Sequence, residues 1–169
     1  SYGYTADGRL TSRVWARAVG GQALVTSYSH TNGSDLAGIA YGDGTPPVSF
    51  GYDRLGRPTT IVDGAGQWSF AYDPATLRLT NEVFAGTNGS GHSLSRTYDE
   101  KGRSTGVGLG ADYRVSHGYD AVGRLGTLAA ELAGAELAFT YGYASNSALV
   151  AQAALAGGGW AMTRSFESQ

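Results

Sequence analysis

"YDRLGRP", residues 52–58, returns with small changes elsewhere in the chain: "YDEKGRS" begins at Tyr98 and "YDAVGRL" at Tyr119. In the shared pattern Tyr-Asp-x-x-Gly-Arg, the Asp side chain can accept a hydrogen bond from the backbone two residues on. The Gly can take a positive φ, as a type I turn followed by a bulge requires. Such a turn joins two antiparallel strands. The motif therefore predicts a tight β-hairpin turn at each copy.

The motif recurs at intervals of 20 to 26 residues, which fits one hairpin of two strands and two turns per repeat. Weaker copies extend the series: residues 4–9 lack the first Asp, and the copy at Tyr72 is one residue longer, with Leu77 where Gly is expected. Copies at Tyr28 and Tyr143 are placed mainly by spacing, and Phe166 takes the same place at the end. The residues that define the repeat are Tyr4, Gly8, Arg9, Tyr52, Asp53, Gly56, Arg57, Tyr72, Asp73, Arg78, Tyr98, Asp99, Gly102, Arg103, Tyr119, Asp120, Gly123 and Arg124.

Before each anchoring Tyr, large and small residues alternate, which is the signature of a strand. The copy at Tyr28 breaks this rule. The pattern predicts that the tyrosines stack on one another across a sheet, and that the opposite face is small enough for another layer to approach. The large residues, two positions before the anchor, are Tyr2, Phe50, Phe70, Arg96, His117 and Tyr141. The small residues directly before it are Gly3, Gly51, Ala71, Thr97, Gly118 and Gly142.

The repeats predict an all-β fold of about seven antiparallel hairpins. Fourteen strands would make an open sheet roughly 67 Å long, and sheets of that size coil, so we expect a spiral or part of a shell. The Asp and Arg of each turn should form a charge ladder at the rim; exposed pairs contribute about 0–1 kcal/mol each, so their main role would be to fix register. Residues 131–137, "ELAGAEL", would also suit a short helix. We expect residues 1–169 to form a single repeat domain, an excerpt of a longer array.

Composition excludes several classes of protein. The 169 residues carry a net charge of −2 and show no basic patch, so nucleic acid is not an expected partner. No cysteine is present, so no disulfide framework can form. No signal peptide and no run long enough to span a membrane is apparent.

The side chains that could act in catalysis or metal binding do not form a recognisable motif in the sequence. The three histidines, His30, His92 and His117, lack the spacing of metal ligands. The glycines of residues 106–110 do not match a phosphate-binding loop, and Ser90 lies in no nucleophile elbow. We expect no enzyme activity, no catalytic or metal-binding residue and no cofactor. An alternative is that aromatic residues form a sugar-binding surface, although the regular placement of the tyrosines favours a role in packing. The less regular aromatics are Trp15, Trp68 and Trp160.

The stretches "YDRLGRPTTIVD", "YDEKGR" and "YDAVGRL" resemble the YD repeats of the Rhs family, and the resemblance covers nearly the whole chain. That family includes bacterial polymorphic toxins, shell components of insecticidal toxin complexes, wall-associated proteins and teneurins. The resemblance implies hairpins that spiral into a hollow β-shell, which in toxin members encloses a C-terminal toxin. The self-cleavage motif of toxin members, D-P-x-G-x-x-D-G, is missing. Its nearest counterparts, at residues 43–44 and 63–64, are better interpreted as hairpin turns.

These observations predict a non-enzymatic structural scaffold, a segment of a β-shell that encloses or displays a toxin polypeptide. The alternative is an extracellular adhesion segment that binds carbohydrate or a partner protein. The expected partners are further repeats of the parent chain and an enclosed or attached C-terminal polypeptide, with self-association through edge strands. By the resemblance, the protein is secreted or on the cell surface, and bacterial.

Overall fold

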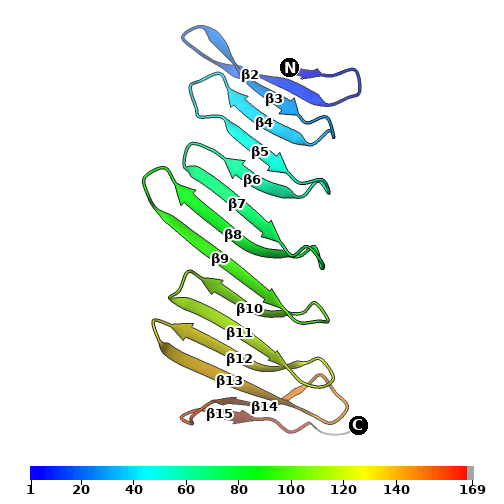
Figure 1. Ribbon diagram of the computed structural model, residues 1–169, viewed down its shortest axis with the longest axis vertical. Coiled ribbons are helices and arrows are strands. Elements are labelled where there is room, and N and C mark those ends of the chain that lie inside the picture. The colour runs from blue at the N-terminus through cyan, green and yellow to red at the C-terminus, as the bar shows by residue number, and fades with distance from the viewer. Residues whose placement is uncertain (167–169) are drawn as a thin grey trace. The chain divides into compact units, whose positions relative to one another are not determined.

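The computed structural model describes residues 1–166, which form β-strands joined by turns, with no helix in that range. Fifteen strands follow one another in chain order in one sheet (Figure 1), so the all-β hairpin fold is confirmed. The strands are β1 (Tyr2–Tyr4), β2 (Leu10–Val19), β3 (Gln22–His30), β4 (Leu36–Tyr41), β5 (Val48–Tyr52), β6 (Pro58–Val62), β7 (Gly66–Tyr72), β8 (Leu79–Gly86), β9 (Gly91–Tyr98), β10 (Ser104–Leu109), β11 (Tyr113–Tyr119), β12 (Leu125–Leu132), β13 (Ala135–Tyr143), β14 (Val150–Leu155) and β15 (Ala161–Thr163).

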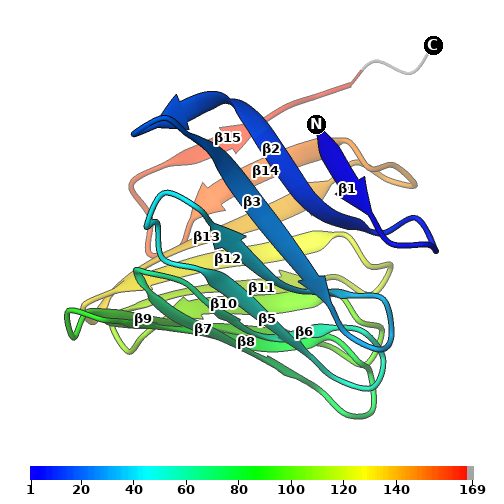
Figure 2. The same cartoon turned by 90° about the horizontal axis from the view of Figure 1, so that it is seen from above.

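The contacts divide the chain into two compact units. Unit 1 comprises residues 1–72 and 81–92, and unit 2 comprises residues 73–80 and those from 93 onwards. Within each unit, consecutive strands lie side by side and are joined alternately at opposite ends (Figure 2). The register of both units can be followed from the antiparallel pairs.

In unit 1 the two faces of the sheet differ in side-chain size. One face pairs Phe50 with Ile61 and Ile61 with Trp68, whereas the other pairs Gly51 with Thr60. The alternation expected from the sequence is therefore present: large apolar residues gather on one face and small or hydroxyl residues on the other.

Unit 2 repeats the arrangement, with Leu128 opposite Phe139 on one face and Gly118 opposite Thr127 on the other. Within residues 1–166, Ala153 is the only buried hydrophobic residue, and it is 5% exposed. Such a sheet has little core of its own, so each hairpin must gain much of its stability from the hairpins beside it.

The Asp-x-x-Gly segments form the predicted turns. In the copy at residues 53–57, the Gly56 amide donates to the Asp53 carbonyl at 3.1 Å, and the Asp53 amide donates to the Arg57 carbonyl at 3.0 Å. Gly56 has a φ of +76°, and the strand register shifts between Gly51 and Tyr52, where the bulge lies. The copies at residues 99–103 and 120–124 make the same backbone bonds. Residues 43–44 and 63–64 also lie in hairpin connections, as expected.

The anchor of the second repeat is His30, so the placement of that anchor at Tyr28 was wrong by two residues. His30 pairs with Leu36 directly after a register shift, as Tyr52 does with Pro58 and Tyr119 with Leu125. Tyr28 then occupies the position of a large residue, and Ser27 and Ser29 occupy the small ones. Once the register is corrected, the three residues before the anchor, 27–29, follow the alternation rule.

Different residues close this second turn. The Thr31 hydroxyl replaces the Asp carboxylate and accepts hydrogen bonds from the amides of Gly33 and Asp35, each at 3.2 Å. Ser34 adopts a φ of +74° where the Asp-x-x-Gly copies use Gly. The turn geometry is therefore retained although the motif cannot be recognised in its letters.

Two other uncertain segments are resolved by the structure. Leu77 takes the left-handed conformation in the longer turn, with a φ of +61°. Residues 131–137 form the β12–β13 hairpin, closed by positive φ at Ala133 and Gly134, and not a helix. Phe166 follows the last strand, and the eighth turn expected after it falls outside the described residues.

Candidate functional site

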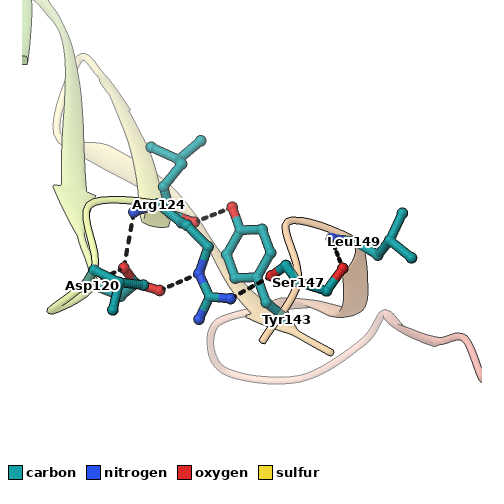
Figure 3. Close-up of polar contacts among 7 residues, drawn as sticks. Asp120, Arg124, Tyr143, Ser147 and Leu149 are labelled. Atoms are coloured by element: carbon teal, nitrogen blue, oxygen red, sulfur yellow. Dashed lines mark hydrogen bonds and ion pairs between the residues drawn. The ribbon is translucent and has the colours of Figure 1, made fainter. Parts of the chain in front are cut away.

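The Asp of each regular turn holds the turn and orients the Arg that ends it. Asp120 Oδ1 accepts hydrogen bonds from the amides of Val122 at 3.0 Å and Arg124 at 2.8 Å (Figure 3). Its Oδ2 accepts from Arg124 Nε at 2.7 Å. One carboxylate thus satisfies two backbone donors and fixes the guanidinium.

That guanidinium reaches the next repeat. Arg124 Cζ lies 4.3 Å from the ring centroid of Tyr143, within the range of a cation–π contact (Figure 3). The Tyr143 hydroxyl donates to the carbonyl of Leu125, the residue after Arg124, at 2.8 Å. Arg124 Nη1 also donates to the carbonyl of Ser147, in the turn that follows Tyr143. The anchoring Tyr of one hairpin is therefore held by the turn of the hairpin before it.

We call this arrangement the Asp–Arg–Tyr junction: the Asp and Arg of one turn with the anchoring Tyr of the next repeat. It recurs along the chain with the same two contacts. The distances from guanidinium carbon to ring centroid are 4.2 Å for Arg57 and Tyr72, 5.6 Å for Arg78 and Tyr98, and 4.1 Å for Arg103 and Tyr119. The hydroxyls donate at 2.9 Å from Tyr72 to Pro58, 3.0 Å from Tyr98 to Leu79, and 2.7 Å from Tyr119 to Ser104.

The junction replaces the expected stacking of Tyr on Tyr, which was wrong. Anchoring tyrosines of consecutive repeats are two strands apart, about 9–10 Å, and rings that far apart do not touch. Among residues 1–166 the ring contacts join other aromatics, such as Trp68 with Phe84 at 4.8 Å. Instead, each of these tyrosine rings lies under the guanidinium of the Arg that ends the preceding Asp-containing turn.

The electrostatics keep the turn carboxylates ionised. Partial desolvation on its own raises the pKa of Asp53, Asp99 and Asp120. Hydrogen bonds from the amide and guanidinium of the Arg four residues on outweigh it, so each pKa lies below its ordinary value. Hydrogen bonds from the Thr76 amide and hydroxyl lower the pKa of Asp73. The junctions therefore keep their charge at neutral pH.

The turn glycine meets a second demand besides its positive φ. At Gly102, a Cβ atom would collide with the guanidinium of Arg78 from the preceding turn. At Gly8, with a similar φ of +83°, a Cβ would meet nothing within 4 Å. Close approach of an Arg is therefore an extra constraint that only some of the turns impose.

The first repeat is the most divergent of those that define the pattern. Thr5 stands where Asp is expected, and Arg9 Nε pairs with Asp7 at 2.8 Å. Arg9 Nη1 donates to the Thr31 carbonyl at 3.4 Å, so it still reaches the next turn. Tyr4 lies on β1 and is 61% exposed.

The three histidines lie on three different strands: His30 on β3, His92 on β9 and His117 on β11. Within the described part of the chain, no cluster of His, Asp and Glu has a geometry that would hold a metal ion. His92 packs against Trp68 and Phe84, with ring centroids 5.5 Å apart in both pairs. Residues 1–166 also contain no helix of the length and apolar character needed to cross a membrane.

The junction is the feature that sequence reasoning missed. Asp, Gly and Arg were recognised as one turn, and Tyr as the anchor of a strand. The contact between Arg and the next Tyr depends on which strands are neighbours, and the motif does not state it. The only signal was that Tyr and Arg recur together with the same period.

No protein-family model matches the chain, and no curated protein sequence matches it. Solved structures do match. The crystal structure of TcdB2-TccC3-TEV has a TM-score of 0.66 and 14% identity over 89% of this chain. The Tc holotoxin pore of Photorhabdus luminescens has 0.67 and 13% over 91%, and TcdB2-TccC3 without its hypervariable C-terminal region has 0.66 and 15% over 89%.

In each of these matches the chain spans 9% of the length of the chain it resembles. Identities this low show a shared fold. The fold agrees with the repeated Tyr-Asp-x-x-Gly-Arg motif, which on its own resembles the YD repeat. The chain thus has the fold of the matched region of these Tc toxin structures.

Proposed function

We propose that this chain is a non-enzymatic scaffold, a segment of a β-shell that encloses or displays a toxin polypeptide. The Asp–Arg–Tyr junction carries the proposal, because it links four successive pairs of repeats in the same way. The fold shared with Tc toxin structures supports it. The partners would be further repeats of a longer array, of which residues 1–169 are one part, and a polypeptide attached to it. The protein would be a secreted or cell-surface protein of a bacterium.

The chemistry of the junction is that of a structural contact. Its carboxylates and guanidinium groups bond to the backbone and to one another, and its tyrosine hydroxyls donate to main-chain carbonyls. A carboxylate that acts as a general acid or base near neutral pH would instead have a pKa raised towards its working pH. Here the shifts are in the opposite direction, since the turn carboxylates are held ionised.

Protection of an attached polypeptide tests the proposal. The parent chain that contains this segment would be treated with protease, and cleavage of the polypeptide after the repeats compared with cleavage of the same polypeptide expressed alone. An enclosing shell predicts much slower cleavage in the parent chain. Cleavage at equal rates would contradict enclosure. Binding of an antibody against the polypeptide to the intact parent chain then distinguishes display from enclosure.

A further inference from the structure

One irregularity in the sheet does not belong to the repeat. Strands β2 and β3 pair regularly up to Val14 and again from Ala18, but between these points residues 15–17 face Leu24 alone. The other register shifts in the described pairs lie beside the hairpin turns at residues 5–9, 31–35, 53–57, 99–103, 120–124 and 144–149. Bulges re-aim side chains, and they concentrate at functional sites. This one lies in unit 1.

The bulge presents an indole ring that is held on two sides. Trp15 Nε1 donates to Thr26 Oγ1 at 3.0 Å, and Arg13 Cζ lies 3.5 Å from the ring centroid. Thr26 is only 4% exposed, and among the described residues it is the only polar one that is buried. Trp15 is nevertheless 42% exposed.

Thr26 is itself an exception to the repeat. It lies four residues before the anchor His30, on the large-residue face. The threonine hydroxyl there has no value for apolar packing, but it fixes the orientation of the indole. The equivalent positions of the other repeats are all apolar: Val48, Trp68, Leu94, Val115 and Phe139.

The indole lines a pocket of about 270 Å³, together with Arg17, Tyr41 and Asp43. Asp43 Oδ1 accepts a hydrogen bond from the Thr45 amide at 3.0 Å, which holds the carboxylate in place. Hydrogen bonds from the side chain and amide of Thr45, and the nearby Arg17, lower the pKa of Asp43. The pocket thus has one anionic and one cationic side chain beside an aromatic ring, and their charges cancel.

We propose that this pocket binds a single ring of a neutral saccharide. An exposed indole can pack against the apolar C–H face of a pyranose, and aromatic lining with a few placed polar groups is typical of small-ligand sites. Asp43 can accept two hydrogen bonds from hydroxyls, and Arg17 can donate two. A balanced charge favours a neutral ligand over an anion or a cation. The proposal does not depend on the shell function, and it gives a location to the carbohydrate-binding alternative.

The test uses the indole N–H signals of the three tryptophans in a two-dimensional NMR spectrum. The chain would be titrated with the methyl glycosides of glucose, galactose, mannose and N-acetylglucosamine. We expect at least one of them to shift the Trp15 signal saturably, with a dissociation constant in the millimolar range. The signals of Trp68 and Trp160 should not move. Trp15→Phe assigns the signal and keeps a ring beneath Arg13.

Two surface variants test the polar groups, and both retain the reporting indole. Asp43→Asn and Arg17→Ala should each weaken binding about tenfold, corresponding to the loss of a charge-assisted hydrogen bond. Trp160→Phe, at an exposed Trp of unit 2, is the matched control and should bind as the unchanged chain does. If none of the four glycosides shifts the Trp15 signal, or if both polar variants bind with unchanged affinity, the proposal is overturned.

Discussion

Two constraints can exclude a side chain at the turn glycine: its positive φ and the close approach of a side chain from the preceding repeat. Gly8 and Gly102 have φ values of +83° and +78°, but only Gly102 lies against the guanidinium of a preceding Arg. A left-handed φ costs an L-residue about 1–2 kcal/mol. The conformational cost should therefore be equal at the two positions, and any difference must come from the neighbouring side chain.

We expect Gly102→Ala to destabilise the chain more than Gly8→Ala. The first substitution adds displacement of Arg78 to the strain of positive φ, whereas the second adds strain alone. Urea denaturation of both variants, followed by tyrosine and tryptophan fluorescence, measures the two changes in unfolding free energy. Equal midpoints would show that the Arg adjusts without cost.

The turn carboxylates should make the stability depend on pH in the acid range. The pKa of Asp120 is lower in the folded chain than in the unfolded one, because hydrogen bonds from Arg124 outweigh partial desolvation. The unfolded state therefore takes up protons first as the pH falls. The stabilisation is complete above the unfolded value, near pH 3.9, and is lost as the pH drops through the folded value.

Asp120→Asn isolates this contribution. The variant keeps a side-chain oxygen for the Val122 and Arg124 amides but loses the charge that pairs with the guanidinium. It should melt at a lower temperature than the unchanged chain at pH 7, and the gap should narrow as the pH falls through the lowered pKa that Asp120 has in the folded chain. Glu136→Gln, an exposed substitution on β13, is the control. A gap that persists unchanged at low pH would contradict the assignment.

At the scale of the hairpin, the Asp–Arg–Tyr junction explains why Tyr, Asp, Gly and Arg recur as a set. Asp and Gly form the turn, Arg ends it, and Tyr receives the Arg of the turn before. Few side chains among residues 1–166 are buried, so such links between hairpins carry a large share of the cohesion of the sheet.

Removing one junction hydroxyl measures its contribution. Tyr119→Phe deletes the bond from the Tyr119 hydroxyl to the Ser104 carbonyl and should destabilise the chain by about 0.5–1.5 kcal/mol. Tyr113→Phe is the matched control, because Tyr113 lies at the other end of β11 and is 39% exposed. Chemical denaturation compares the two. If both variants have the stability of the unchanged chain, the hydroxyl contributes nothing to the junction.

The same scale shows how far sequence reasoning extends. The turns at residues 53–56, 99–102 and 120–123 could be predicted, because Asp and Gly act within a few positions of each other. The second turn was missed because Thr31 and Ser34 meet those requirements with other side chains. The junctions were missed because Arg and Tyr meet across strands that the motif alone does not place together.

The candidate pocket was beyond prediction for a different reason. Trp15 and Asp43 are separated in sequence, and they line one pocket because two extra residues of β2 bulge out opposite Leu24. The irregular placement of Trp15 was visible in the sequence, but its partner Thr26 could not be identified without the register of β3.

At the scale of the whole molecule, the first and last strands present open edges. Strands β1 and β15 are three residues long, and among residues 1–166 each is paired with a strand on one side only. Large apolar side chains on or near these strands are exposed: Tyr2 at 59%, Tyr4 at 61%, Trp160 at 49% and Phe166 at 43%. An unpaired strand edge is a template for pairing with another chain. Because the two strands are short, few backbone groups are available for pairing with another chain. The exposed aromatic rings nevertheless favour burial of these edges against a partner.

We therefore expect copies of this chain to associate through these edges. Static light scattering over a concentration series should show a mean mass that rises above the 17.5 kDa monomer. Tyr4→Lys places a charge on the β1 edge and should reduce the rise, because charged edges oppose strand addition. Arg54→Lys, on an exposed turn, is the control and should leave the rise in mean mass unchanged. A constant monomer mass at every concentration would show that three-residue strands are short enough to protect both edges, despite the exposed rings.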